Sequence, residues 1–137
     1  MLATLFLLAQ MFDLTSVKAE VNLDRRADLA LLNANASLDR AKASYSNGEY
    51  KQSTEAVLEI RDSIEVCNEA LKATGKDPRR NSKQFKKIEL RVQTLIRRVK
   101  GFAQGVSIED RALVQQVQAR LEEINDDMVS GIFTKSK

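Results

Sequence analysis

The 137-residue chain contains no histidine and no tryptophan, and it has only one cysteine and one proline. Without histidine, the chain cannot supply a Ser-His-Asp triad, an imidazole-ligated zinc ion or a histidine-ligated haem. A single cysteine cannot form an internal disulfide, so stability has to come from packing. No glycine-rich phosphate-binding loop is present in the sequence either. We therefore expect a protein that is not an enzyme and has no cofactor or metal site.

Two features that could suggest chemistry have simpler interpretations. Cys67 lies between Ile64 and Leu71 in an apolar repeat, which predicts a small buried residue. Four carboxylates lie close together near the C-terminal end, but adjacent residues on one helix diverge by about 100° and cannot converge on one cation. We therefore predict a solvated acidic face there. Its members are Glu122, Glu123, Asp126 and Asp127.

Apolar residues recur at spacings of three and four in four segments, the pattern of helices that bury one face. The four stripes run over 27–45, 50–71, 85–102 and 114–132. Alanines in the first stripe permit close helix approach, and Leu32 is among the residues expected to widen it. The pattern predicts an all-α fold, an antiparallel up-down four-helix bundle made of two helical hairpins. We expect one domain over 20–133 and a short disordered tail at 134–137.

Specific residues mark the expected helix ends. Asn47-Gly48 is typical of a left-handed helix C-terminus, and the short turn that follows forces antiparallel neighbours. Gly75 predicts a second such end, with Pro78 delaying the next helix until about residue 82. The third helix is expected to fray over 101–105. Ser107 and Asp110 have the spacing of a capping box at the start of the fourth helix.

The first nineteen residues, MLATLFLLAQMFDLTSVKA, resemble a cleavable export signal. An apolar run over 2–12 is followed by Val17-Lys18-Ala19, a small-x-Ala cleavage pattern, although no basic residue precedes the run. The run is too short to span a bilayer, which needs about 20 residues. We predict cleavage after Ala19 and an exported protein, periplasmic or extracellular. A retained membrane-proximal helix and an ordinary buried first helix are the alternatives.

The stretch from Ala41 to Ser53, AKASYSNGEYKQS, resembles the turn of a tetratricopeptide repeat, in which small residues, tyrosines and a glycine recur at this spacing. The resemblance covers one hairpin, at about 27–74, and the rest of the chain does not repeat it. It implies a protein-binding adaptor whose groove between the first two helices involves Tyr45, Tyr50 and Ser53. We expect the two tyrosines to pack together with both hydroxyls directed to solvent. The whole chain also resembles small uncharacterised exported helical-bundle proteins of bacteria, which implies no particular activity.

Positive charge is concentrated in one part of the chain. Residues 76–100 contain ten basic and two acidic residues, whereas the whole chain has a net charge of only +3. The basic side chains fall opposite the apolar stripe of the third helix, so they should face solvent. They form either a solvated face that acidic neighbours neutralise or an anion-binding surface. The anion-binding candidates are Arg79, Arg80, Lys83, Lys87, Arg91 and Arg98.

These observations lead to one expectation about function and two alternatives. We expect a structural or interaction module that binds a protein or an anionic component of the cell envelope through the third helix. The first alternative is the tetratricopeptide-like adaptor. The second, which requires a cytoplasmic protein, is a nonspecific nucleic-acid-binding bundle. We do not favour nucleic acid, because the basic stretch has no free aromatic side chain for base stacking.

Overall fold

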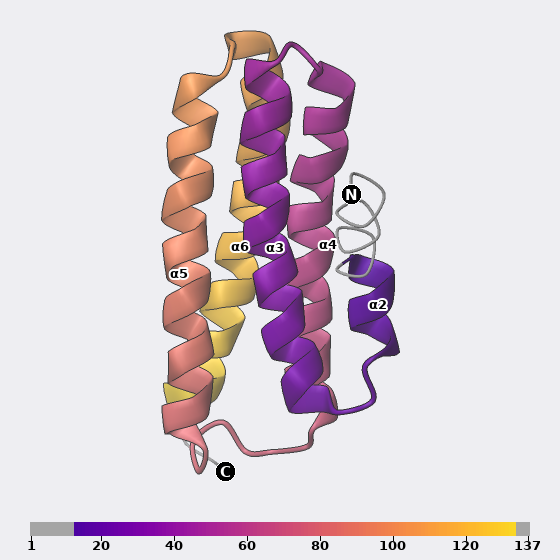
Figure 1. Cartoon of the computed structure of the whole chain (residues 1–137). Coiled ribbons are helices and arrows are strands. Elements are labelled where there is room, and N and C mark those ends of the chain that lie inside the picture. Colours follow the sequence, from indigo (N-terminus) through magenta and orange to yellow (C-terminus); the bar gives the residue numbers. More distant parts are fainter. Residues whose placement is uncertain (1–12, 134–137) are drawn as a thin grey trace.

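The computed structural model describes residues 13–133, which form helices and, within that range, no strand. The helices are α2 (Leu14–Ala19), α3 (Leu23–Ser46), α4 (Tyr50–Ala73), α5 (Ser82–Gly105) and α6 (Ile108–Phe133). The all-α prediction is confirmed, and the molecule is a helical bundle (Figure 1). None of the described helices combines the length and the apolar character needed to cross a membrane. The expected tail at 134–137 and most of the apolar leader, 1–12, lie outside the described residues.

The two glycine turns have the predicted left-handed backbone. Gly48 has a φ of +76° after the last turn of α3, and Gly75 has a φ of +70° after α4. At the first turn, the Glu49 amide donates to the Ser44 carbonyl and the Gly48 amide to the Tyr45 carbonyl. These two bonds are those of a Schellman motif, which satisfies carbonyls left free at a helix end. By contrast, the predicted fraying of the third helix is wrong, because α5 continues to Gly105.

The core is made of the four predicted stripes. Leu31, Ile64, Leu95 and Leu121, one from each long helix, are completely buried. Two assignments on the stripes are wrong: Tyr50 is 55% exposed and Leu32 is 48% exposed. Both side chains lie at the border of a buried helix face. The spacing of apolar residues does not show where that face ends and the solvent-exposed face begins.

Small residues hold α3 and α4 together, as expected from the alanine-rich first stripe. This pair of helices makes the most extensive contacts in the described part of the chain. Polar side chains are also buried at the interface: Asn33 is fully buried and donates from Nδ2 to Glu59 Oε2 (3.1 Å) and to Ser63 Oγ (2.9 Å). Glu59 also pairs with Arg40. Because a shifted pairing would strand these buried groups, the cluster fixes the register of the hairpin.

The second half of the predicted leader is helical and packed. In α2, Val17 is 2% exposed and belongs to the core, and Leu14 is partly buried against it. The helix contacts both α3 and α4. Asp13 caps it by accepting a hydrogen bond from the Ser16 amide at 2.8 Å. Residues 14–19 therefore cover a surface that cleavage after Ala19 would expose.

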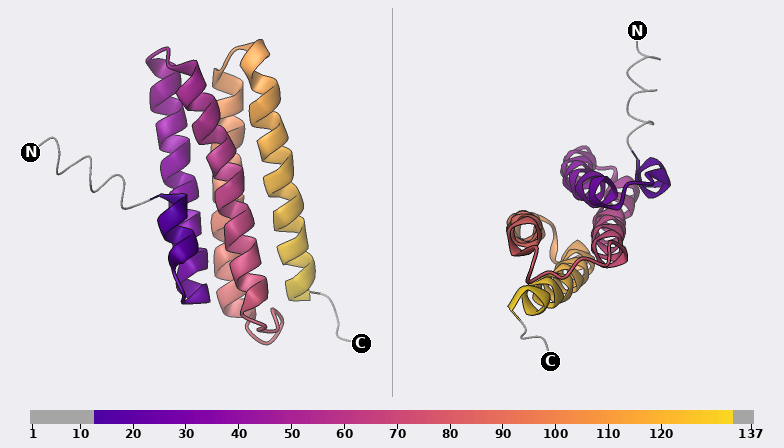
Figure 2. Two further views of the ribbon diagram at one scale, coloured as in Figure 1. Left: turned by 90° about the vertical axis from the view of Figure 1, so that its right-hand side faces the viewer. Right: turned by 90° about the horizontal axis from the view of Figure 1, so that it is seen from below.

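The arrangement of the hairpins positions the candidate site. The α3–α4 turn and the α5–α6 turn lie at the same end of the molecule, and the α4–α5 loop lies at the other (Figures 1 and 2). Helix α4 packs against α6, and α3 against α5. Residues close to positions 45–50 are thereby brought next to residues close to positions 102–110.

Candidate functional site

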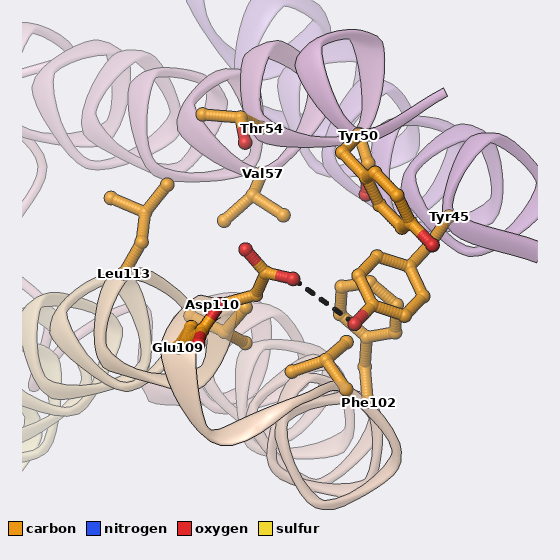
Figure 3. A pocket seen from close by; sticks show the side chains of 11 residues that line it. Tyr45, Tyr50, Thr54, Val57, Phe102, Glu109, Asp110 and Leu113 are labelled. Atoms are coloured by element: carbon orange, nitrogen blue, oxygen red, sulfur yellow. Dashed lines mark hydrogen bonds between the residues drawn. The ribbon is translucent and has the colours of Figure 1, made fainter. Parts of the chain in front are cut away.

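A small cavity lies at the turn end of the bundle (Figure 3). All three groove candidates, Tyr45, Tyr50 and Ser53, line it. Its volume is about 100 Å³. The lining residues come from both hairpins. From the first hairpin they are Tyr45, Tyr50, Ser53, Thr54 and Val57, and from the second they are Phe102, Val106, Glu109, Asp110, Leu113 and Val114.

The three aromatic rings pack edge to face at one side of this cavity. The centroid of the Tyr45 ring lies 5.0 Å from that of Tyr50 and 6.0 Å from that of Phe102, with interplanar angles of 66° and 86°. These geometries are the ones that aromatic quadrupoles favour. The predicted packing of the two tyrosines is confirmed.

The hydroxyl of Tyr45 makes two hydrogen bonds to the second hairpin that the sequence did not indicate. It donates to Asp110 Oδ2 at 3.1 Å and accepts from the Ser107 backbone amide at 2.8 Å. These partners could not be predicted from the first hairpin, because they lie at the start of α6, more than 60 residues away in the sequence. The predicted capping residues are in place, since the Asp110 amide donates to Ser107 Oγ at 3.4 Å.

Ser53 lines the cavity, but its hydroxyl is already engaged in a hydrogen bond between helices. The residue is 4% exposed, and its hydroxyl donates to the Ala41 carbonyl at 2.8 Å. This bond ties α4 to α3, so the interface between the first two helices is filled. The opening that Tyr45, Tyr50 and Ser53 share lies between the two hairpins.

The structure separates the six anion-binding candidates into two groups. Arg91 lies 3.1 Å from Asp28, and Arg98 lies 2.6 Å from Asp39, so α3 carboxylates neutralise this side of α5. Arg79 lies 3.7 Å from Asp77. The solvated, neutralised interpretation describes these three arginines.

The other three candidates, Arg80, Lys83 and Lys87, line one shallow hollow at the start of α5. We call them the basic cluster. Arg80 is 88% exposed, with Asp77 as a distant partner at 4.0 Å, and no ion pair involves Lys83 or Lys87 within the described chain. Asn81, the N-cap residue of α5, makes no side-chain capping bond. The unpaired lysines therefore lie beside first-turn backbone amides that no side chain caps.

Cys67 and the acidic residues of α6 lie in different surroundings. Cys67 is completely buried, and this burial raises the pKa of its thiol to about 12. Two of the four carboxylates on α6 pair with different basic residues: Asp127 lies 2.9 Å from Lys72, and Glu123 lies 3.1 Å from Arg120. Over residues 13–133, no three acidic, histidine or cysteine side chains are grouped as metal ligands would be.

Sequence reasoning did not identify Phe102, Glu109 or Asp110 as site residues. Asp110 was assigned only to the helix start, and Phe102 only to the end of the third apolar stripe. Comparison with family models, with curated proteins and with solved structures gives no match to this chain. The assignment of function therefore depends on the geometry of the basic cluster and of the turn-end cavity.

Proposed function

We propose that the protein is an exported, non-enzymatic interaction module that binds anionic partners through the basic cluster. In this proposal the four long helices act as one up-down bundle that presents Arg80, Lys83 and Lys87 from its loop end. The observation that carries the proposal is that these three side chains share one exposed hollow, in which Lys83 and Lys87 form no ion pair and Arg80 has only Asp77 at 4.0 Å. In the cell envelope, the anions within reach are lipid headgroups and acidic polymers.

The test is binding of the full chain to vesicles that contain anionic lipid, measured across a salt series. We expect binding that weakens with ionic strength and is still measurable at about 0.15 M, where only a dense cluster survives screening. The variant Arg80→Gln/Lys83→Gln/Lys87→Gln should lose this binding and keep its stability.

The matched control is Lys42→Gln/Lys51→Gln/Lys100→Gln. These lysines are exposed, make no ion pair within the described residues, and lie toward the opposite end of the bundle. The net charge changes by the same amount, so only the location differs. Equal loss in the two triple variants would reduce the effect to overall charge and contradict the proposal.

Export is part of the same proposal. The apolar run over 2–12 and the Val17-Lys18-Ala19 pattern support it. Expression of the full gene followed by N-terminal sequencing should give a product that begins at or near Glu20 outside the cytoplasm. Intact residues 1–19 on cytoplasmic protein would contradict export and would favour the nucleic-acid-binding alternative.

One observation favours the adaptor as a second candidate. Tyr45, Tyr50 and Ser53, which carry the resemblance to a tetratricopeptide turn, line the same cavity. An adaptor would lose its partner on Tyr50→Ala, because this ring is more than half exposed at the cavity edge. It would be indifferent to the Gln variants of the basic cluster.

A further inference from the structure

We propose that the turn-end cavity binds a primary alkylammonium group, such as the end of a lysine side chain. The inference deepens the adaptor candidate by naming the chemistry of its ligand, and it does not depend on anion binding by the basic cluster. It rests on the charge, the aromatic composition and the size of the cavity.

The cavity carries negative charge without a counterion. Glu109 and Asp110 are among its lining residues, and no lysine or arginine is. In the described chain, neither carboxylate forms an ion pair, whereas all three acidic residues of α3, Asp24, Asp28 and Asp39, do. The helix dipole favours acidic side chains in the first turn of a helix, which accounts for these two residues. It does not supply a cationic partner for them.

Asp110 has one oxygen available for a ligand. Its Oδ2 atom accepts from Tyr45 and from Ser107 Oγ (2.9 Å), so the carboxylate is held in position. Figure 3 shows the other oxygen pointing toward Val57. The hydroxyl of Thr54 also borders the space. An ammonium group has three donors and no acceptor, and it matches this set of acceptors.

The aromatic and aliphatic walls suit the rest of such a group. A cation within about 6 Å of an aromatic centroid is attracted by the face of the ring, and Tyr50 is exposed at the mouth. Val57 and Leu113 provide an apolar surface for a methylene stem. At about 100 Å³ the cavity is smaller than the roughly 300–1,000 Å³ of drug-sized ligand sites, so it fits the end of a side chain.

The chain offers a specific probe for this site. It has two tyrosines and no tryptophan, and both tyrosines line the cavity. Intrinsic tyrosine emission therefore reports on this cavity alone. We would titrate the full chain with n-butylammonium, with tetramethylammonium and with the neutral n-butanol. We expect saturable emission changes with n-butylammonium, weaker binding of tetramethylammonium, which has no N–H donor, and no saturation with n-butanol.

The variant Glu109→Gln/Asp110→Asn should weaken n-butylammonium binding by about tenfold or more. The single variant Glu109→Gln leaves the Asp110 hydrogen bonds in place, so a weaker response there cannot come from a lost helix cap. The control is Glu122→Gln/Asp126→Asn, which removes the same charge from exposed positions further along α6. Equal affinity in the wild type and in Glu109→Gln/Asp110→Asn would overturn the proposal.

Short peptides distinguish the sources of the ammonium group and separate this inference from the adaptor. A lysine-containing peptide that binds more tightly than n-butylammonium points to a protein segment, and equal affinities point to a free amine. If the same peptide with leucine in place of lysine binds equally well, the cavity accepts segments and only the ammonium inference fails. If neither the amines nor the peptides bind, the adaptor fails with it.

Discussion

The hydroxyl of Tyr45 lies 3.1 Å from Asp110 Oδ2 and links the ends of the two hairpins. In an ordinary capping box the acid would accept directly from the amide of the N-cap residue. Here the Ser107 amide donates to Tyr45, which donates in turn to Asp110. A residue of the first hairpin therefore completes the N-terminal cap of α6.

We predict that Tyr45→Phe lowers the free energy of unfolding by about 1 kcal/mol, because it removes one donor and one acceptor while keeping the ring contacts. A double-mutant cycle with Asp110→Ala, followed by urea denaturation, should show a coupling of about 0.5 kcal/mol or more. Additive effects would mean that the two side chains do not interact in solution.

The core assignments predict large effects at buried leucine and isoleucine positions. Leu95→Ala and Ile64→Ala should each cost about 2–5 kcal/mol, since both side chains are completely buried. Arg98→Ala should cost less than about 1 kcal/mol, because its pairing with Asp39 is partly exposed to solvent. Chemical denaturation of the three variants provides the comparison. Similar small losses at all three positions would contradict the core assignment.

The all-α character of the fold and several helix ends could be predicted, because this information is local in the sequence. Periodicity placed the four stripes, and Gly48 and Gly75 placed two helix ends through a backbone angle that favours glycine. The same reasoning did not predict that Asn33 is buried, because an apolar repeat identifies only apolar positions. The burial of Asn33 depends on its hydrogen bonds to Glu59 and Ser63 on the facing helix.

The candidate site could be predicted only in part, because its residues come from both hairpins and local patterns do not show which hairpins meet. Tyr45, Tyr50 and Ser53 were identified because they share one turn, but Phe102 and Asp110 join them only when the hairpins meet. The basic stretch was identified from charge alone. Which members stay unpaired depends on where Asp28 and Asp39 lie on α3, and a charge count does not contain that information.

Cys67 offers a test of packing that needs no mutation. Its thiol is completely buried, and its raised pKa of about 12 keeps it protonated at neutral and mildly alkaline pH. We predict that a thiol reagent modifies the native protein only as fast as the chain unfolds, and the denatured protein at once. Because this is the only cysteine, the reaction reports on a single site. Rapid modification of the native protein would show that the α4 stripe is open.

The pH dependence of stability should include a contribution from Asp24. The Lys76 ammonium, which donates to Asp24 Oδ2 at 2.9 Å, holds the pKa of this carboxyl below its ordinary value of 3.8, and Gln84 adds to the effect. Because the folded pKa is the lower one, the contribution is present above about pH 3.8 and is lost as the pH falls through the folded pKa.

This contribution can be measured by following the Asp24 carboxyl in an NMR titration. Lys76→Gln should raise the pKa of Asp24 toward its ordinary value, since it removes the main cause of the shift. Lys51→Gln, which changes an exposed lysine on α4, is the control and should leave the titration unchanged. An unchanged pKa in Lys76→Gln would show that the ion pair does not form in solution.

The last prediction concerns α2, where the export proposal and the packing meet. Val17→Ala should cost about 1–2 kcal/mol, because the side chain is 2% exposed, whereas the exposed neighbour Lys18→Ala should have little effect. A chain that begins at Glu20 lacks α2 altogether. We expect it to fold, since Leu31, Ile64, Leu95 and Leu121 remain, but with a lower midpoint in urea and with newly exposed apolar surface on α3 and α4. If that shorter chain does not fold, cleavage after Ala19 cannot yield a stable protein, and α2 is then a structural helix of the bundle.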